Sequence, residues 1–401
     1  MEDVIIIGGG PVGFINALGL AQAGVRVTVI EAESQITKSP RAAVYFWSVL
    51  EGLGRLGILE EAEAAGVRKQ DYTYLVRSTG ERIEYSMEVL AGHTPHPYNL
   101  HLSQDRLAEI AMRKLQGLSN ATVRFDTRLE DLQQDAEGVT LSVATGRETQ
   151  ELRARWVIGA DGAGSTVRRL LGLSFDGVTW PERFVATNVY CDFERYGYAR
   201  ATFVIDGRFG AVIVILNNEG LWRCTYMEDA TLPEETFLER LPQVFQTIVR
   251  GEGCYELERA SPYRMHQRSA ETYRVGRVTL AGDAAHVTNP TGGLGLTSGL
   301  LDSYALYPAL AAVVLEGTDD EVLDRYSAAR RDIFVNRVSP QATTNKRLVF
   351  HANGGGRELE EALQSLRRLA TDPQFRWQRL MFTKSLETPP LVGTARSGCA
   401  A

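Results

Sequence analysis

The chain has 401 residues, which suffices for a large core and predicts two lobes. Its composition is that of an ordinary soluble protein, and its net charge of -7 argues against nucleic-acid and anionic-membrane partners. We expect no metal site, because the cysteines are spread too far apart for a CxxC pair or a metal knuckle: Cys191, Cys224, Cys254 and Cys399.

The chain opens on an apolar run, residues 4–7, that predicts a buried parallel strand. No basic segment precedes it, so a signal peptide is not expected. The longest apolar run, residues 304–315, is interrupted by Pro308, is too short to span a bilayer and predicts a buried helix. We therefore expect no membrane span and a cytoplasmic protein.

Three glycines follow the first strand and predict a nucleotide-binding turn. Gly8 allows a tight turn, and Gly10 lets the backbone approach a pyrophosphate. Gly13 lets the following helix pack close to the strand.

That helix is predicted over residues 11–22 and opens on Pro11 and Val12. Its N-terminus would present free N–H groups and a positive dipole end to the phosphates. Glu31 stands at the end of the next predicted strand, where a carboxylate can accept hydrogen bonds from ribose hydroxyls. The pattern predicts a bound dinucleotide without identifying it.

A second motif begins with a predicted buried strand, residues 156–159, that enters a tight turn at Asp161. Asp161 either contributes to a ligand site or simply forms the turn, since Asp-Gly is a frequent turn pair. A helix is expected over residues 165–171, and it includes Arg168.

A third motif follows a predicted strand that ends at residue 281. Gly282 and Asp283 would then lie at a sheet edge, where the carboxylate can bind a hydroxyl group. His286 comes shortly after, and we favour a structural role for it over that of a catalytic base.

A glycine-rich loop completes the third motif. It begins at Pro290, and Gly293 and Gly295 leave its backbone bare. A helix is predicted from about Leu296, and its N-terminus would point at whatever lies over the loop.

The three motifs, in this order, resemble those of the single-component FAD-dependent aromatic hydroxylases, the family that includes p-hydroxybenzoate hydroxylase. The resemblance covers most of residues 1 to about 340 and is strongest in the motifs. It implies that Asp161 helps to bind the flavin pyrophosphate and that Asp283 binds the ribityl chain. The helix after the loop would stabilise negative charge on the reduced flavin ring.

Two more residues match family positions. Arg41 would lie along the ribityl chain and pyrophosphate, unless it is a surface arginine. Gln104 would contact the cofactor, unless it is an ordinary first-turn residue of a helix predicted to about residue 115 and capped by Ser103. The chain departs from the family at Thr297, where many relatives have asparagine.

The resemblance therefore implies a set of cofactor contacts. Four of these residues also form the predicted catalytic loop: Pro290, Gly293, Leu294 and Gly295. The cofactor set comprises Gly8, Gly10, Pro11, Val12, Gly13, Glu31, Arg41, Gln104, Asp161, Gly282, Asp283, Pro290, Gly293, Leu294, Gly295 and Leu296.

Between the second and third motifs the sequence is rich in β-formers and turn signals. It predicts an antiparallel sheet that roofs a substrate pocket, with strands at residues 184–193, 199–205, 211–216 and 221–227.

Strand alternation places Trp222 and Tyr226 on one face of the last strand and Arg223 on the other. Arg223 either clamps an acidic substrate or is a solvated outer residue. Tyr190, Trp222 and Tyr226 either stack on an aromatic substrate or fill the core.

The predicted fold class is α/β, with a Rossmann-type FAD-binding domain, an inserted antiparallel β-sheet substrate domain and a C-terminal helical region. The FAD-binding domain is expected at residues 1–72, 98–176 and 271–340, the substrate domain at 73–97 and 177–270, and the helical segment and tail at 341–401. Within and after the last part we expect helices at 322–335 and 358–369, a loop at 353–356 and a poorly ordered tail from 387.

The resemblance implies an FAD-dependent monooxygenase that hydroxylates a small aromatic molecule, phenolic or heteroaromatic, through a flavin C4a-hydroperoxide. NADPH or NADH and O2 would be the cosubstrates, and the nicotinamide would bind transiently because only one dinucleotide fold is predicted. A Baeyer–Villiger or ring-opening monooxygenase and a non-catalytic flavin sensor remain alternatives. A monomer or a homodimer is expected.

Overall fold

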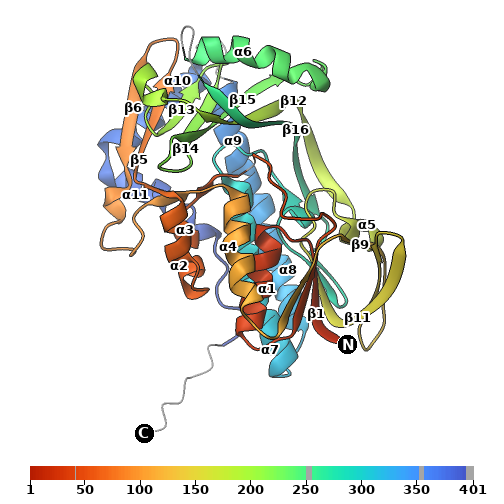
Figure 1. The fold of residues 1–401 in the computed structure, drawn as a ribbon. Coiled ribbons are helices and arrows are strands. Elements are labelled where there is room, and N and C mark those ends of the chain that lie inside the picture. Colours follow the sequence, from red (N-terminus) through yellow and green to blue (C-terminus); the bar gives the residue numbers. More distant parts are fainter. Residues whose placement is uncertain (41, 250–254, 352–355, 394–401) are drawn as a thin grey trace.

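The computed structural model describes residues 1–40, 42–249, 255–351 and 356–393. Two large sheets dominate it, one in the upper half of Figure 1 and one at the lower right, with a group of helices between and beside them. Arg41, the predicted loop at 353–356 except for residue 356, and the last part of the predicted tail lie outside the described residues.

The lower sheet has a parallel centre made of apolar strands, as the sequence predicts. β1 pairs in parallel with β2 and with β11, and β11 pairs in parallel with β18. In spatial order the strands are β17 (Arg274–Val275), β18 (Val278–Leu280), β11 (Glu148–Gly159), β1 (Glu2–Ile7), β2 (Val27–Ile30) and β8 (Ala121–Arg124). β10 (Val139–Thr145) pairs antiparallel with β11, and β9 (Thr127–Gln134) pairs antiparallel with β10.

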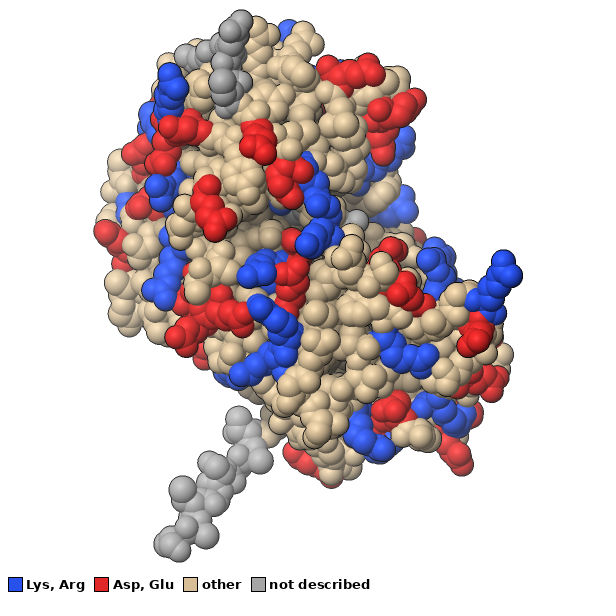
Figure 2. All heavy atoms as spheres, in the orientation of Figure 1, with Lys and Arg blue, Asp and Glu red and all other residues tan. Residues whose placement is uncertain are grey.

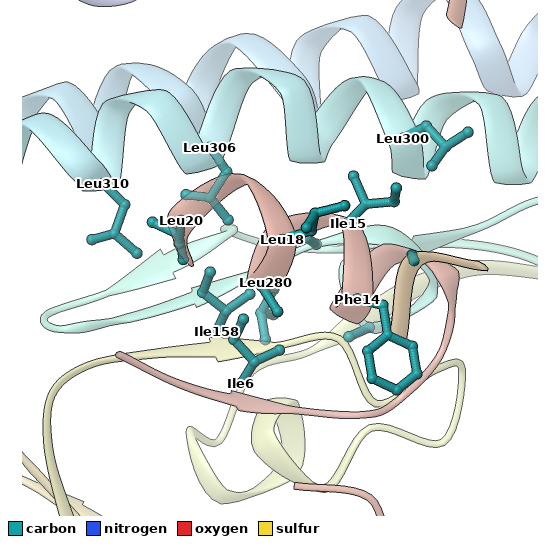
Figure 3. Packing of buried hydrophobic residues seen from close by; sticks show 14 of the residues in the cluster. Ile6, Phe14, Ile15, Leu18, Leu20, Ile158, Leu280, Leu300, Leu306 and Leu310 are labelled. Atoms are coloured by element: carbon teal, nitrogen blue, oxygen red, sulfur yellow. The ribbon is translucent and has the colours of Figure 1, made fainter. Parts of the chain in front are cut away.

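One face of this sheet is covered by helices that form the main core. Helix α1 (Pro11–Gln22) packs between the strands and α7 (Leu294–Leu315), so that Ile6 and Ile158 meet Leu18 in a dry layer (Figure 3). Helix α4 (Gln104–Gln116) packs beside α1. Burial of these apolar side chains is the main stabilising term.

Helix α7 has the length and apolarity of a membrane span, but 72% of its most apolar window is buried inside the protein. It is therefore a core helix, as expected for the run at residues 304–315. It contains Pro308 without a break and begins two residues before the predicted start.

The upper sheet is mainly antiparallel, as predicted, although β13 and β5 pair in parallel. Strands β5 and β6 come from the short segment before α4 and complete one edge. In spatial order the strands are β19 (His286–Val287), β16 (Glu256–Ala270), β12 (Phe175–Tyr190), β15 (Leu221–Asp229), β14 (Ala211–Ile215), β13 (Ala201–Ile205), β5 (Asp71–Val76) and β6 (Glu81–Ser86).

Helix α6 (Phe237–Ile248) covers the outer face of the upper sheet (Figure 1). Its Leu241 and Phe245 join Trp222 and Tyr226 in a buried cluster. The sequence analysis did not predict this helix, whose pattern is interrupted by Pro242.

Smaller elements connect the sheets. A third sheet consists of β3 (Val44–Tyr45), β7 (Asn99–His101) and β4 (Val67–Lys69), and two short helices contact it, α2 (Trp47–Arg55) and α3 (Leu59–Ala65). Another short helix, α5 (Thr166–Leu170), lies against β9.

The C-terminal part is helical, as predicted. Helix α8 (Glu321–Ile333) continues through a π-helical turn, Phe334–Val338, into α9 (Ser339–Phe350). Helices α10 (Arg357–Thr371) and α11 (Pro373–Leu380) follow and lie against β5 and β6 at the left of Figure 1. Acidic and basic side chains are interspersed over the face shown in Figure 2.

Candidate active site

A cavity of about 760 Å³ is lined from both large sheets, from α7 and from α11. It collects residues that the sequence analysis selected from distant segments. Those that line it are Gly8, Gly10, Pro11, Val12, Glu31, Gln104, Asp161, Gly282, Asp283, Pro290, Gly293, Leu294, Gly295 and Leu296.

The first glycine motif forms a tight turn with one open position. Gly8 has φ of +111°, and a Cβ there would lie 2.3 Å from the carbonyl oxygen of Ala160. A Cβ on Gly13 would lie 1.9 Å from the carbonyl oxygen of Gly8, so α1 packs too close to the strand for any side chain. Gly10 has no atom within 4 Å of such a Cβ, which leaves space beside the start of α1 for a ligand.

Glu31 is fixed at the end of β2 by two backbone hydrogen bonds. Its Oε2 accepts from the N–H of Gly9 at 2.6 Å, and its Oε1 accepts from the N–H of Glu33 at 2.9 Å. A carboxylate oxygen has more than one lone pair, so Glu31 can still accept from a ligand hydroxyl in the cavity.

Asp161 lies in the second motif and caps α5. Its carboxylate accepts from the hydroxyl of Ser165 at 2.5 Å and from the N–H groups of Thr166 at 2.7 Å and Val167 at 3.1 Å. Burial raises the pKa of Asp161, and these hydrogen bonds oppose the rise. Asp161 therefore organises the turn and also faces the cavity.

Arg168 joins the second motif to the third. Its buried guanidinium donates to the carbonyl oxygens of Ala284 at 2.8 Å and Ala163 at 2.7 Å. The same group lies 3.7 Å from the centre of the Phe175 ring. Burial lowers the pKa of Arg168, and the charge of Asp161 opposes that effect.

The glycine-rich loop ends at the N-terminus of α7. Gly293 is the N-cap residue with φ of +69°, and no side chain caps the helix there. Thr297 does not reach into the cavity, because its hydroxyl donates to the carbonyl oxygen of Gly293 at 3.0 Å. The backbone N–H groups of the first turn of α7 are therefore left to face a ligand.

His286 has a structural contact, as we favoured. Its Nε2–H donates to Oδ2 of Asp302 at 2.7 Å, and Arg330 donates to Oδ1 at 2.7 Å. Gly282 N–H also donates to Asp302, so α7 is tied to the third motif. Burial alone would raise the pKa of Asp302, but the electrostatic contacts with His286 and Arg330 outweigh it and hold the pKa below its usual value.

Comparison with known proteins identifies the family of the chain. Residues 1–341 match the model of the FAD binding domain family. The chain is 43% identical over 388 residues to the 6-hydroxy-3-succinoylpyridine 3-monooxygenase HspB of Pseudomonas putida (strain DSM 28022 / S16), covering 96% of this chain and 98% of that protein. It is 44% identical over 349 residues to the para-nitrophenol 4-monooxygenase of Pseudomonas sp. (strain WBC-3), covering 86% of each.

A solved structure agrees in both fold and length. The crystal structure of p-nitrophenol 4-monooxygenase PnpA from Pseudomonas putida DLL-E4 superposes with a TM-score of 0.92 at 40% identity, covering 96% of this chain and 98% of that one. The chain belongs to the FAD-dependent aromatic monooxygenases. The resemblance inferred from the three motifs is thereby confirmed.

The cavity of this monooxygenase fits FAD at its glycine-lined end. Gly10 leaves open space at the start of α1, the start of α7 is uncapped, and the exposed carboxylate of Asp283 faces the same cavity. Backbone N–H groups at two helix starts suit a pyrophosphate and an electron-rich ring edge, and a carboxylate suits hydroxyl groups.

The other end of the cavity has an aromatic wall. Tyr72 stacks on Tyr85 with ring centres 5.6 Å apart, and Tyr85 stacks on Tyr74 at 6.3 Å. Tyr74 in turn stacks on Phe203 at 5.0 Å. All four residues line the cavity, so this part of the cavity of the monooxygenase has an aromatic lining.

Arg223 brings a positive charge from β15 to the cavity. It is 3% exposed, and its Nε–H donates to Oδ1 of Asn188 at 2.7 Å. Burial lowers the pKa of Arg223 to about 10, which leaves the guanidinium charged at neutral pH. Of the two interpretations of Arg223, the solvated outer residue is wrong, because the strand turns this side chain inward.

The other three predicted substrate residues lie elsewhere, which corrects the prediction that they contact substrate. Trp222 and Tyr226 point to the opposite face of β15 and fill the core under α6. Tyr190 is 37% exposed at the end of β12 and does not line the cavity. Trp222 and Tyr226 therefore fill the core, which was the other interpretation considered for these aromatic residues.

A buried hydrogen-bond chain lies behind the aromatic wall. Nδ1–H of His101 donates to the carbonyl oxygen of Ile215 at 3.1 Å, which leaves Nε2 to accept from the hydroxyl of Tyr72 at 3.1 Å. Asn99 donates to the same hydroxyl at 2.7 Å. Burial lowers the pKa of His101 to about 4, so its ring is neutral at physiological pH.

Sequence reasoning missed most of the aromatic wall and the contribution of α11. The alternation of Tyr72 and Tyr74 along one strand was a usable signal, because residues two apart share a face. Arg379 and Phe382 gave no such signal, since only the folded chain brings them to the cavity.

Proposed function

We propose that this enzyme hydroxylates a phenolic or hydroxylated heteroaromatic ring, with NADPH or NADH as electron donor. Two relatives that share 43% and 44% of aligned residues with this chain are named after substrates with such rings, 6-hydroxy-3-succinoylpyridine 3-monooxygenase and para-nitrophenol 4-monooxygenase. The wall formed by Tyr72, Tyr85, Tyr74 and Phe203 supports a flat substrate of this kind.

When bound, FAD takes two electrons from NAD(P)H and activates O2, so that one oxygen atom enters the ring and the other leaves as water. The protein's task is to hold the cofactor, orient the ring and exclude water. We assign the adenosine and pyrophosphate contacts to Gly8, Gly10, Pro11, Val12 and Glu31. Gln104, Asp161, Gly282 and Asp283 would hold the ribityl and pyrophosphate part, and Gly13 acts through close packing.

We assign the catalytic loop to residues 290–295, with Pro290, Gly293, Leu294 and Gly295 against the flavin ring. The uncapped start of α7 supports this assignment, because the positive end of a helix dipole favours anionic charge by ~1 kcal/mol near its first turn. Leu296 would contact the same ring from within that turn.

The observation that carries the proposal is the continuity of one cavity from the glycine turns to the aromatic wall. A cofactor and a ring bound at its two ends would lie in the same enclosed space. We further propose that Arg223 orients the ring, that residues 73–97 and 177–270 form a substrate domain on the FAD-binding domain, and that the enzyme acts in the cytoplasm as a monomer or homodimer.

The test is a turnover assay on the purified flavoprotein. NADPH and NADH oxidation are followed with 4-nitrophenol, 4-ethylphenol and 2-hydroxypyridine, and products are analysed by mass spectrometry under 18O2. We expect at least one of these aromatic compounds to stimulate the oxidation of NADPH or NADH and to yield a product that gains one 18O atom.

Other results would select the alternatives. A lactone or a ring-opened product would favour a Baeyer–Villiger or ring-opening monooxygenase. Bound FAD without stimulated oxidation by either nicotinamide would favour a flavin-binding sensor.

A further inference from the structure

The cavity wall is completed by residues beyond the part of the chain that matches the FAD binding domain family, which ends at residue 341. Leu369 of α10, Arg379 and Leu380 of α11, and Phe382 and Thr383 after it all line the cavity. This C-terminal wall is therefore separate from the cofactor-binding motifs in sequence, although it contributes to the same cavity.

The C-terminal wall is anchored to the cofactor-binding part of the molecule. The indole Nε1–H of Trp47 donates to the carbonyl oxygen of Leu380 at 3.1 Å. The backbone N–H of Trp47 donates to Oδ1 of Asn99 at 3.0 Å, and both Trp47 and Asn99 line the cavity. The end of α11 is thus held at a fixed place beside the aromatic wall.

Arg379 supplies the positive charge of the C-terminal wall. Its side chain is exposed and makes no hydrogen bond or ion pair with any residue that the structure describes. Its neighbours on the same helices differ, since Arg376 donates to the carbonyl oxygens of Leu369 and Ala370, and Arg368 pairs with Asp372 at 3.0 Å. Arg379 alone of the three therefore keeps its donors for the cavity.

Tyr74 and Tyr85 line the same cavity as Arg379, and Tyr85 packs in one apolar cluster with Leu380, the residue that follows Arg379. Tyr74 and Tyr85 are half-buried on β5 and β6, line the cavity, and their hydroxyls form no hydrogen bond within the described part of the chain. Burial raises the pKa of both phenols, and the charge of Arg379 opposes the rise in each. Both hydroxyls thus stay protonated at neutral pH and can donate.

These groups lie away from the first two glycine motifs. Figure 1 shows β5, β6 and α11 together at the left of the molecule, whereas β1 and β11, which carry the first two motifs, lie at the right. A guanidinium and two hydroxyls are donors suited to a carboxylate, and an arginine can bind one through two parallel hydrogen bonds.

We propose that Arg379, together with the hydroxyls of Tyr74 and Tyr85, binds a carboxylate on the substrate, at the end of the molecule away from the first two glycine motifs. The inference rests on the proposed function and narrows its substrate class to aromatic acids with a ring hydroxyl. The aromatic wall holds the ring, and the C-terminal wall selects the acidic substituent.

The test is a binding titration of the FAD-loaded enzyme with a matched pair of phenols. 4-Hydroxyphenylacetate carries the carboxylate, and 4-ethylphenol has the same carbon skeleton without it. Binding is read from the change in the flavin absorption spectrum, which needs no turnover. We expect the parent enzyme to bind the acid more tightly, and Arg379→Ala to raise its Kd about tenfold or more with about twofold change for 4-ethylphenol.

Further variants separate recognition from general damage. Arg379→Lys should retain part of the affinity for 4-hydroxyphenylacetate, and Arg379→Glu should make the enzyme bind 4-ethylphenol more tightly than the acid. Tyr74→Phe and Tyr85→Phe should each weaken the binding of the acid and leave the binding of 4-ethylphenol unchanged. Arg357→Ala is the control, because this arginine pairs with Glu361 on the outer surface of α10 and its side chain is 92% exposed.

Equal losses for the acid and 4-ethylphenol in Arg379→Ala, or a parent enzyme that binds 4-ethylphenol as well as the acid, would overturn the inference. The proposed function would stand in that case if 4-ethylphenol still stimulates NAD(P)H oxidation and gains one 18O atom. Binding of the acid without any stimulated oxidation would instead support the carboxylate site and contradict the proposed function.

Discussion

The guanidinium of Arg168 donates to the carbonyl oxygen of Ala284 at 2.8 Å and so joins segments 116 residues apart. A second donor of the same side chain reaches Ala163 within its own turn. One buried cation therefore holds the second and third glycine motifs at a fixed separation. FAD would bind across both, so this contact is expected to shape the cofactor site without touching the reacting atoms.

Arg168→Ala should lower both stability and flavin content. The substitution leaves the carbonyl group of buried Ala284 without its donor, and we expect a loss of about 2 kcal/mol in the free energy of unfolding of the apoprotein. Urea unfolding and the ratio of flavin to protein absorbance measure the two effects. Arg169→Ala is the control, because this exposed neighbour bonds only to Thr166 among the described residues, and it should change stability by less than about 0.5 kcal/mol. Unchanged flavin content in Arg168→Ala would contradict the role given to this residue.

Gly8→Ala and Gly10→Ala should fail in different ways. A Cβ at Gly8 would collide with Ala160, and its φ of +111° is unfavourable for alanine, so the protein itself should be destabilised by several kcal/mol, roughly 3 or more. Gly10 has an extended backbone and open space around it, so Gly10→Ala should leave the apoprotein stable but weaken FAD binding. Thermal unfolding of both apoproteins, with FAD titrations, checks the contrast. Normal FAD affinity in Gly10→Ala would mean that the pyrophosphate does not approach there.

Asp283→Asn should weaken FAD retention with little effect on folding. The side chain is exposed at the cavity, and an amide is a poorer acceptor for a ribityl hydroxyl than a carboxylate. We expect the Kd for FAD to rise about tenfold, measured by fluorescence titration of the apoprotein. The melting temperature of the apoprotein serves as the control. Full flavin occupancy after dialysis would show that Asp283 does not hold the cofactor.

The three motifs could be predicted from sequence because each one is local. A strand end, a glycine at a required φ and a helix start lie within about fifteen residues, and each leaves a pattern. The face of β15 could not be predicted in this way. Alternation separates Trp222 from Arg223, but only the packing of α6 on one side decides which of them meets the cavity. The contribution of Arg379 depends on where α11 docks, which no local pattern records.

His101 should make the stability of the protein depend on pH in the acidic range. Its pKa is lowered to about 4 by burial, from an ordinary value of 6.5, so the folded state binds fewer protons than the unfolded state between these values. This contribution to stability is complete above pH 6.5 and is lost as the pH falls toward 4, by on the order of 3 kcal/mol. His101→Gln should flatten that part of the curve, as measured by urea unfolding at several pH values. A parallel decline in the free energy of unfolding of the parent protein and of His101→Gln would show that other groups control this pH dependence.

The long strands β12 and β16 pair with each other in the upper sheet and extend down toward the lower sheet (Figure 1). Their register shifts between the pair Thr179 with His266 and the pair Arg183 with Arg264. A continuous ladder resists bending, and an irregular step in it is where a strand flexes most easily. Any movement of the upper sheet relative to the lower sheet would bend these strands at residues 180–182. The hydrogen bond from Nζ of Lys346 to Oε2 of Glu182, at 2.9 Å, would restrain that bending.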